Sequence, residues 1–190
     1  MTGARPYVAS VNPTPPTTAE QLLRTSLPDK RVELVHGVLV VREPPGMRHG
    51  RIAMNLAHRL ADFARARGLG QVYAAETGFH LARDPDTVRA PDIAFVAAAR
   101  LPTPEPPGFA ELAPDLVVEV LSPGDRPGET LAKVGDWLQA GTRLVWVIDP
   151  ERRLARVYRA DGSETHLSAA DALDGEDVVP GFGCRLEEVL

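Results

Sequence analysis

The run PDLVVEVLSPGD, residues 114–125, constrains the fold more than any other stretch of the sequence. Its apolar, β-branched residues are typical of a strand that is buried on both faces of a sheet. Glu119 lies inside this run, where an ionised carboxylate is costly to bury unless it is paired or binds a metal ion. The sequence therefore predicts a partner for Glu119, which is either an arginine at the end of the strand or a metal ion.

The composition is that of an ordinary globular protein. The chain has 190 residues, of which 44% are hydrophobic and 25% are charged, and this balance predicts one domain over residues 17–190. Residues 1–16 are rich in Pro and Thr without periodicity, which predicts a disordered lead-in. No apolar stretch reaches the length of a membrane span and no secretory signal is evident, so we expect a cytoplasmic protein without a membrane partner.

The charge and the cysteine content exclude two classes of function. A formal net charge of -5 argues against a protein that coats nucleic acid non-specifically, but it is compatible with an enzyme whose acidic residues bind a metal. A single cysteine, Cys184, excludes an intramolecular disulfide and a cysteine-rich zinc site. Among 21 basic residues only Lys30 and Lys133 are lysines, so each of them deserves a specific explanation.

Local patterns predict the N-terminal half of the fold. Thr18 and Gln21 fit a capping box at the start of a short helix over 18–26, and a hairpin follows over 31–43. Residues 49–68 form a long amphipathic helix. Its apolar face carries Ile52, Leu56, Leu60 and Phe63, and its opposite face carries Arg48, Arg51, Asn55 and Arg59.

The C-terminal half alternates strands with one helix. Strands are expected over 71–76, 78–83, 90–96, 116–121 and 143–150, with an edge strand over 153–162 and a last strand within 171–190. The Pro-rich residues 101–114 predict a surface loop. A helix over 128–141 places Leu131, Val134 and Leu138 on one face. The order of elements predicts a mixed α/β or α+β layer structure.

Three residues with complementary chemistry lie on the elements at the centre of this pattern. Asp92 starts the strand over 90–96, Glu119 lies in the next strand, and Lys133 lies early in the following helix. If the two strands are neighbours, their carboxylates can approach one another and then need a cation. Carboxylate oxygens suit Mg²⁺ or Mn²⁺ better than zinc. A magnesium or manganese site at Asp92 and Glu119 would satisfy the buried carboxylate.

The sequence from about residue 17 to residue 190 resembles the Uma-type restriction endonucleases, a bacterial branch of the PD-(D/E)XK nuclease superfamily. No single motif is specific, but five of them occur in the order that the family shows. These are VELVHGVLV (32–40), HGRIAMNLAHRL (49–60), ETGFHLARDPDTVRAPDIAFV (76–96), PDLVVEVLSPGD (114–125) and KVGDWLQAGTRLVWVIDP (133–150).

The resemblance implies a restriction-endonuclease-like core, with a central mixed β-sheet flanked by helices. It implies a metal-dependent endonuclease that hydrolyses phosphodiester bonds of DNA with Mg²⁺ or Mn²⁺. Asp92 and Glu119 would hold the metal, and Lys133 would supply the positive charge. Glu33 would complete the metal site as an outer ligand or would orient a metal-bound water molecule.

Two positions depart from the pattern of the superfamily. Leu121 stands where the motif has its lysine, so Lys133 must supply that charge from the next helix, an arrangement that this family shows. Trp137 stands where relatives often have tyrosine, which predicts that a hydroxyl contact is absent.

The residues alone leave several roles open. His49 is a helix cap, a phosphate contact or a surface histidine, and Glu76 either joins the acidic cluster or does not. The arginine stripe of the long helix either follows a nucleic-acid backbone or is a solvated face. Two other functions remain as alternatives: a nuclease that acts on RNA, and a non-catalytic nucleic-acid-binding or assembly module of the same fold. A homodimer is plausible because two sites related by symmetry can cut both strands of a duplex.

Overall fold

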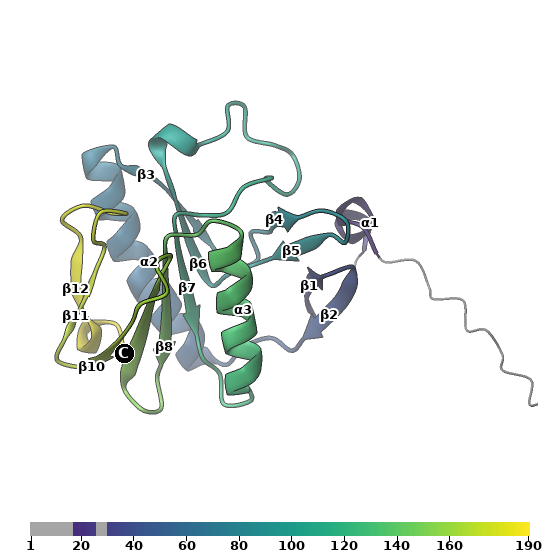
Figure 1. Cartoon of the computed structure of the whole chain (residues 1–190). Coiled ribbons are helices and arrows are strands. Elements are labelled where there is room, and N and C mark those ends of the chain that lie inside the picture. Colours follow the sequence, from purple (N-terminus) through teal and green to yellow (C-terminus); the bar gives the residue numbers. More distant parts are fainter. Residues whose placement is uncertain (1–16, 26–29) are drawn as a thin grey trace, which may run out of the picture.

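The computed structural model describes residues 17–25 and 30–190 (Figure 1). The expected lead-in over residues 1–16 lies outside the described residues, and the single-domain boundary at residue 17 stays a prediction. Helix α1 (Ala19–Arg24) begins at the predicted capping box. Gln21 N donates to Thr18 Oγ1 at 3.2 Å, and Thr18 N donates to Gln21 Oε1 at 2.8 Å.

A six-stranded mixed sheet forms the centre of the molecule, in the order β10-β9-β8-β7-β6-β3. Its strands are β3 (Gly70–Ala74), β6 (Ile93–Ala97), β7 (Leu116–Val120), β8 (Leu144–Asp149), β9 (Leu154–Arg159) and β10 (Glu164–Ser168). Strands β7 and β8 pair in parallel through a helical crossover, and the other pairs of this sheet are antiparallel. The predicted edge strand, β9, is an interior strand, because the polar strand β10 pairs along its outer side.

Helix α2 (Met47–Arg67) covers one face of this sheet (Figure 1). Ile52, Leu56 and Leu60 are fully buried at the predicted spacing, and Phe63 is half-buried. The helix ends at Gly68, whose φ of 63° places it in the left-handed conformation that glycine adopts at little cost. The hydrophobic period of the sequence therefore predicted this helix and its buried face.

Helix α3 (Pro127–Gln139) covers the opposite face of the sheet, in front of β7 and β8 in Figure 1. The predicted buried face was wrong in one respect. Leu131 is 50% exposed, whereas Val134 and Trp137 are buried. The helix is rotated so that Lys133 and Trp137 reach Glu119, since both side chains donate hydrogen bonds to that carboxylate.

A second, antiparallel sheet stands beside the first, in the order β2-β1-β5-β4. Its strands are β1 (Arg31–Val35), β2 (Val38–Arg42), β4 (Phe79–Ala82) and β5 (Thr87–Arg89). The predicted β1–β2 hairpin turns at His36 and Gly37, which both have positive φ as the tightest hairpin turns require. Strand β5 was missed, because three residues are too few for a visible alternation of polar and apolar positions.

The C-terminal segment packs against α2. It contains β11 (Ala172–Asp174), β12 (Gly183–Arg185) and a 3-10 turn, η2 (Leu186–Glu188); a second such turn, η1 (Ala98–Arg100), precedes the predicted Pro-rich loop. The polar stripe of α2 binds this segment. Both terminal nitrogens of Arg51 donate to Leu190 O at 3.2 Å, Asn55 donates to Val189 O at 3.5 Å, and Arg59 pairs with Glu188 at 2.7 Å.

Arg48, Arg51 and Arg59 are nevertheless exposed, so this face of α2 is solvated while its side chains also contact the C-terminal segment. Arg48, at the start of the stripe, donates in the same way to the main-chain oxygen of Pro150. Across residues 17–25 and 30–190, no helix has both the length and the apolar character needed to cross a bilayer.

Candidate active site

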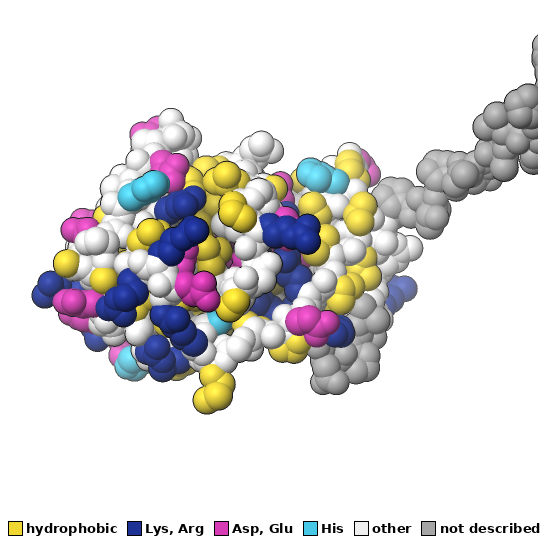
Figure 2. All heavy atoms as spheres, turned by 90° about the horizontal axis from the view of Figure 1, so that it is seen from below, with side chains coloured by type: hydrophobic (Ala, Val, Ile, Leu, Met, Phe, Trp, Pro, Cys, Tyr) yellow, Lys and Arg dark blue, Asp and Glu magenta, His cyan; other side chains and the backbone are white. Residues whose placement is uncertain are grey.

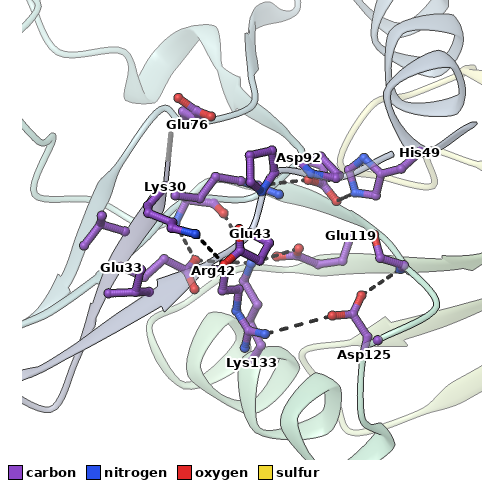
Figure 3. A pocket seen from close by; sticks show the side chains of 18 of the residues that line it. Lys30, Glu33, Arg42, Glu43, His49, Glu76, Asp92, Glu119, Asp125 and Lys133 are labelled. Carbon is purple, nitrogen blue, oxygen red and sulfur yellow. Dashed lines mark hydrogen bonds and ion pairs between the residues drawn. The ribbon is translucent and has the colours of Figure 1, made fainter. Parts of the chain in front are cut away.

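A cleft of about 850 Å³ opens between the second sheet, the chain after β7 and the start of α3. We call it the central cleft. The four residues predicted for the site all line it: Glu33 from β1, Asp92 from the residue before β6, Glu119 from β7 and Lys133 from α3 (Figure 3). Asp92 and Glu119 are only 4% and 8% exposed. The fold thus gathers the predicted residues at the floor of one cleft.

Glu119 is bound by two donors from α3. Lys133 Nζ lies 3.0 Å from its Oε2, and Trp137 Nε1 donates to its Oε1 at 3.0 Å. Burial, together with the nearby charges of Asp92 and Glu33, raises the pKa of Glu119 from 4.5 to about 7, although Lys133 opposes the rise. Trp137 has no hydroxyl, as the sequence predicted, and its indole N–H makes the polar contact to Glu119 instead.

Asp92 is held by three donors that no local pattern connects to it. Its Oδ2 accepts from Val120 N at 2.8 Å and lies 3.0 Å from His49 Nε2, while Arg31 donates to its Oδ1 at 3.1 Å. Burial raises the pKa of Asp92. The hydrogen bond and the charge of His49 lower it, and so do the charge of Lys133 and the hydrogen bond from Val120 N. The lowering effects are larger, so the pKa of Asp92 lies below its ordinary value. Asp92 is therefore ionised at neutral pH.

Lys133 stands between two carboxylates. Its Nζ lies 3.0 Å from Glu119 Oε2 and 3.2 Å from Glu33 Oε1, and it donates to Ala90 O at 3.2 Å. Burial lowers the pKa of Lys133, but the charges of Glu119, Glu33 and Asp92 more than reverse this, and the pKa is raised. The ammonium group is thus held in its charged form at the floor of the cleft.

Glu33 is fixed by a buried arginine. Arg89 donates to its Oε2 at 3.0 Å and to Asp136 Oδ2 at 2.9 Å, and Ala90 N donates to Glu33 Oε1 at 2.9 Å. Burial raises the pKa of Glu33. The charges of Lys133 and Arg89 and the hydrogen bond from Ala90 N lower it by more, so the pKa lies below its ordinary value and the carboxylate stays ionised. Arg89 ties β1 to α3 and thereby fixes the distance between Glu33 and Lys133.

A metal site with Glu33, Asp92 and Glu119 as ligands stays a prediction. Within the described part of the chain, no three His, Cys, Asp or Glu side chains form a group that could hold a metal ion. The physical reason is that Lys133 lies between Glu33 and Glu119, and Arg89 and Ala90 engage Glu33. Asp92 and Glu119 remain as two hard ligands, which suits Mg²⁺ or Mn²⁺ because these ions take one or two carboxylates and complete their shell with water and phosphate.

Two residues whose roles the sequence left open now have positions. His49 is 7% exposed and contacts Asp92, so it is neither a surface residue nor a helix cap. Glu76 is exposed and lines a part of the cleft away from the other labelled carboxylates (Figure 3). Sequence reasoning missed Arg31 and Arg89, and the only available signal was their place at the ends of short strands.

The comparisons with known proteins give the family and the fold of the chain. A family model, Uma2, described as "Putative restriction endonuclease", matches residues 19–187. The chain belongs to the Uma2 family. A search of curated proteins found no match.

The fold of this Uma2 chain also matches a solved structure. That structure is described as a "putative nuclease belonging to DUF820" from Anabaena variabilis ATCC 29413. The two chains align with a TM-score of 0.80 over 92% of this chain and 97% of the other, at 18% sequence identity. The predicted fold class, a restriction-endonuclease-like core with a central mixed sheet flanked by helices, is confirmed. Membership of the Uma2 family supports a nuclease function for the chain.

Proposed function

We propose that this chain is a metal-dependent endonuclease that hydrolyses phosphodiester bonds of DNA. One observation carries the proposal: two buried carboxylates, Asp92 just before β6 and Glu119 in β7, line one cleft together with the largely buried ammonium group of Lys133. Burying such charges is unfavourable for stability alone, and groups of this kind are common in sites of catalysis. The family match and the fold of the solved relative support the same conclusion.

Asp92 and Glu119 would hold the cation. A divalent cation bound there would neutralise charge on the phosphate and make a water molecule more acidic. The oxygen of water forms a bond to phosphorus while the bond from phosphorus to a sugar oxygen breaks. The attacking water loses a proton, and the leaving sugar oxygen takes one up and becomes a hydroxyl group, so that one product ends in a phosphate group and the other in a hydroxyl group.

Lys133 would stabilise the negative charge that develops on the phosphate oxygens, since a fixed ammonium in a buried site needs little reorganisation during the reaction. Glu33 would act through Lys133. Its contacts with Arg89, Ala90 N and Lys133 support a role in positioning the ammonium group rather than the predicted role as a metal ligand.

Two competing functions are cleavage of RNA and a non-catalytic assembly role. The buried charges at the floor of the cleft favour catalysis over assembly. A homodimer would allow both strands of a duplex to be cut, and a cytoplasmic location would give access to nucleic acid. Both remain predictions that light scattering and cell fractionation would measure.

The test is a cleavage assay with supercoiled plasmid in Mg²⁺ and in Mn²⁺. Wild type should nick or linearise the plasmid, and Glu119→Ala and Lys133→Met should each lose the activity. Glu43→Ala is a matched control, because Glu43 lines the same cleft but is largely exposed and pairs with Lys30. Equal activity in all four purified proteins would identify a contaminating nuclease and would overturn the proposal.

A further inference from the structure

The position of the candidate catalytic groups restricts which nucleic acid can reach them. Asp92, Glu119 and Lys133 lie at the floor of the central cleft and are nearly inaccessible to solvent. The cleft volume of about 850 Å³ falls within the range of roughly 300–1,000 Å³ that encloses a single drug-sized ligand. A short piece of one strand fits such a volume.

Stiffness adds to this restriction. Bending or kinking a duplex so that one phosphate enters a cleft costs on the order of 1–6 kcal/mol. An unpaired strand bends freely at each nucleotide. The burial of the reactive groups therefore favours an unpaired strand.

The mouth of the cleft is narrowed by an ion pair. Arg42 of β2 lies 3.4 Å from Glu129 of α3 and 4.0 Å from Asp125, so its guanidinium group links the hairpin to the far wall (Figure 3). These groups are partly exposed, and a phosphate entering the cleft could replace the carboxylates as the partner of Arg42. A single phosphate needs only one such exchange.

The charge around the cleft does not match the charge of a duplex. Its basic residues Lys30, Arg31 and Arg42 are each paired with a carboxylate. Figure 2 shows basic, acidic and hydrophobic side chains interspersed on the face seen from below, without a continuous basic band. A duplex carries one charge per about 1.7 Å of its axis and one strand carries half as many, so the weaker charge of a single strand suits this surface better.

The same cleft carries apolar side chains at its mouth. Leu23 of α1 is 52% exposed and Val41 of β2 is 45% exposed, and both line the cleft together with Phe109. Unpaired bases stack or pack on such side chains, whereas the faces of paired bases are hidden inside a duplex. These three side chains provide an apolar surface within the cleft for an unpaired base.

We propose that the central cleft takes an unpaired strand of DNA, with a flanking base against Leu23, Val41 and Phe109, and that it excludes duplex. This inference rests on the proposed function and names the substrate of the same site.

The experiment compares one labelled oligonucleotide in three forms: single-stranded, annealed to its complement, and paired except for a central bubble. In Mn²⁺ the single strand should be cleaved at least about tenfold faster than the duplex, which is the effect of one lost base contact. The bubble substrate should be cut within its unpaired region. Equal or faster cleavage of the full duplex would overturn the inference.

A pair of valines on one strand tests the base contact. Val41→Ser should raise KM for the single strand several-fold with little change in kcat, because it removes ground-state binding. Val38→Ser is the control, since Val38 lies on the same strand and is 64% exposed but does not line the cleft. Equal effects of the two substitutions would count against the base contact.

Failure of this inference is distinguishable from failure of the proposed function. Binding is measured by fluorescence anisotropy in EDTA with the same oligonucleotides. Preferential binding of the single strand, weakened by Val41→Ser but without cleavage in any metal, would overturn the nuclease proposal and support the inference. Equal binding of single strand and duplex would overturn the inference. If the single strand is cleaved when it is made of RNA and stays intact when it is made of DNA, the substrate of the site is RNA.

Discussion

Glu119 is a carboxyl group inside an apolar strand, and its partners in the folded chain are Lys133 and the indole of Trp137. Neither partner is the arginine at the end of the strand that would have satisfied a purely structural carboxylate. The arrangement leaves one lysine between Glu119 and Glu33. Stability and chemistry at this site therefore depend on the same ammonium group.

Removal of that ammonium group should affect both properties. Lys133→Met removes the ammonium group between Glu33 and Glu119 and leaves Glu119 buried without a cationic partner, so the free energy of unfolding should fall by about 3–5 kcal/mol at neutral pH. Cleavage should fall by about two to three orders of magnitude when assayed on the folded fraction. Urea unfolding and the plasmid assay measure the two effects.

The other lysine is the control. Lys30 pairs with Glu43 at a more exposed position, so Lys30→Met should cost less than about 1 kcal/mol. A loss of stability equal to that of Lys133→Met would show that the buried position of Lys133 does not matter.

The pKa of Glu119 predicts a pH dependence of metal binding. It is about 7 in the folded chain against an ordinary value of 4.5, so this carboxyl contributes stability below pH 4.5 that is lost as the pH rises through about 7. A divalent cation needs the ionised form. The affinity for Mn²⁺ should therefore rise about tenfold for each pH unit below about 7 and level off above it.

Calorimetric titration with Mn²⁺ across that pH range measures the effect. In Glu119→Ala the Mn²⁺-induced rise of the melting temperature should be lost, because the folded state no longer binds the ion more tightly than the unfolded state. An affinity that does not change between about pH 6 and about pH 8 would contradict the role of Glu119 as a ligand.

His49 should orient Asp92. The His49→Ala substitution removes one of the two donors to Asp92 Oδ2, and the affinity for Mn²⁺ should fall by about tenfold to a hundredfold, as is typical for residues that hold a metal ligand. His49→Gln should recover part of the loss, because its amide can donate. His58→Ala on the same helix is the control, since His58 is exposed and pairs with Asp62. Equal losses for both histidines would refute the positioning role.

At the scale of elements, α2 has two faces with different tasks. Its apolar face packs on the central sheet, and its polar stripe binds the main chain of the C-terminal segment. Arg51 and Asn55 donate hydrogen bonds to the carbonyl oxygens of Leu190 and Val189. Carbonyl oxygens at the end of a segment need such donors, because they lack a partner in regular secondary structure. The stripe thus fixes the helix that carries His49.

The C-terminal contact predicts a measurable contribution to stability. Val189 is fully buried in the core between α2 and the sheet, so Val189→Ala should lower the free energy of unfolding by about 1–3 kcal/mol. Leu131→Ala is the control, since Leu131 is half-exposed on α3 and alanine is a good helix former. Thermal unfolding of both variants decides the point, and equal melting temperatures would contradict it.

At the scale of the whole molecule, the position of the cleft bears on the oligomeric state. A homodimer is useful for cutting two strands at once, whereas an unpaired strand needs one site. The initial rate of single-strand cleavage should therefore increase in direct proportion to the enzyme concentration. A rate that increases with the square of the concentration would show that two copies act together.

The sequence by itself determined the elements and the presence of a charged site. The period of α2, the capping box of α1, the β1–β2 turn and the buried run around Glu119 depend on residues that are close in the chain. Local backbone preferences and hydrophobic spacing act over such short distances, so their outcome can be predicted without a fold. The candidate residues Asp92, Glu119, Lys133 and Glu33 were also found from the sequence, through motif order in a known family.

The tertiary structure alone decided which charges meet. His49 reaches Asp92 across 43 positions of the sequence, and Arg89 reaches Glu33 across 56. Lys133 lies between Glu33 and Glu119. The rotation of α3 and the interior place of β9 followed from contacts of the same long range. Sheet register and the pairing of buried charges set these contacts, because a buried carboxylate is stable only where a particular donor from a distant element reaches it.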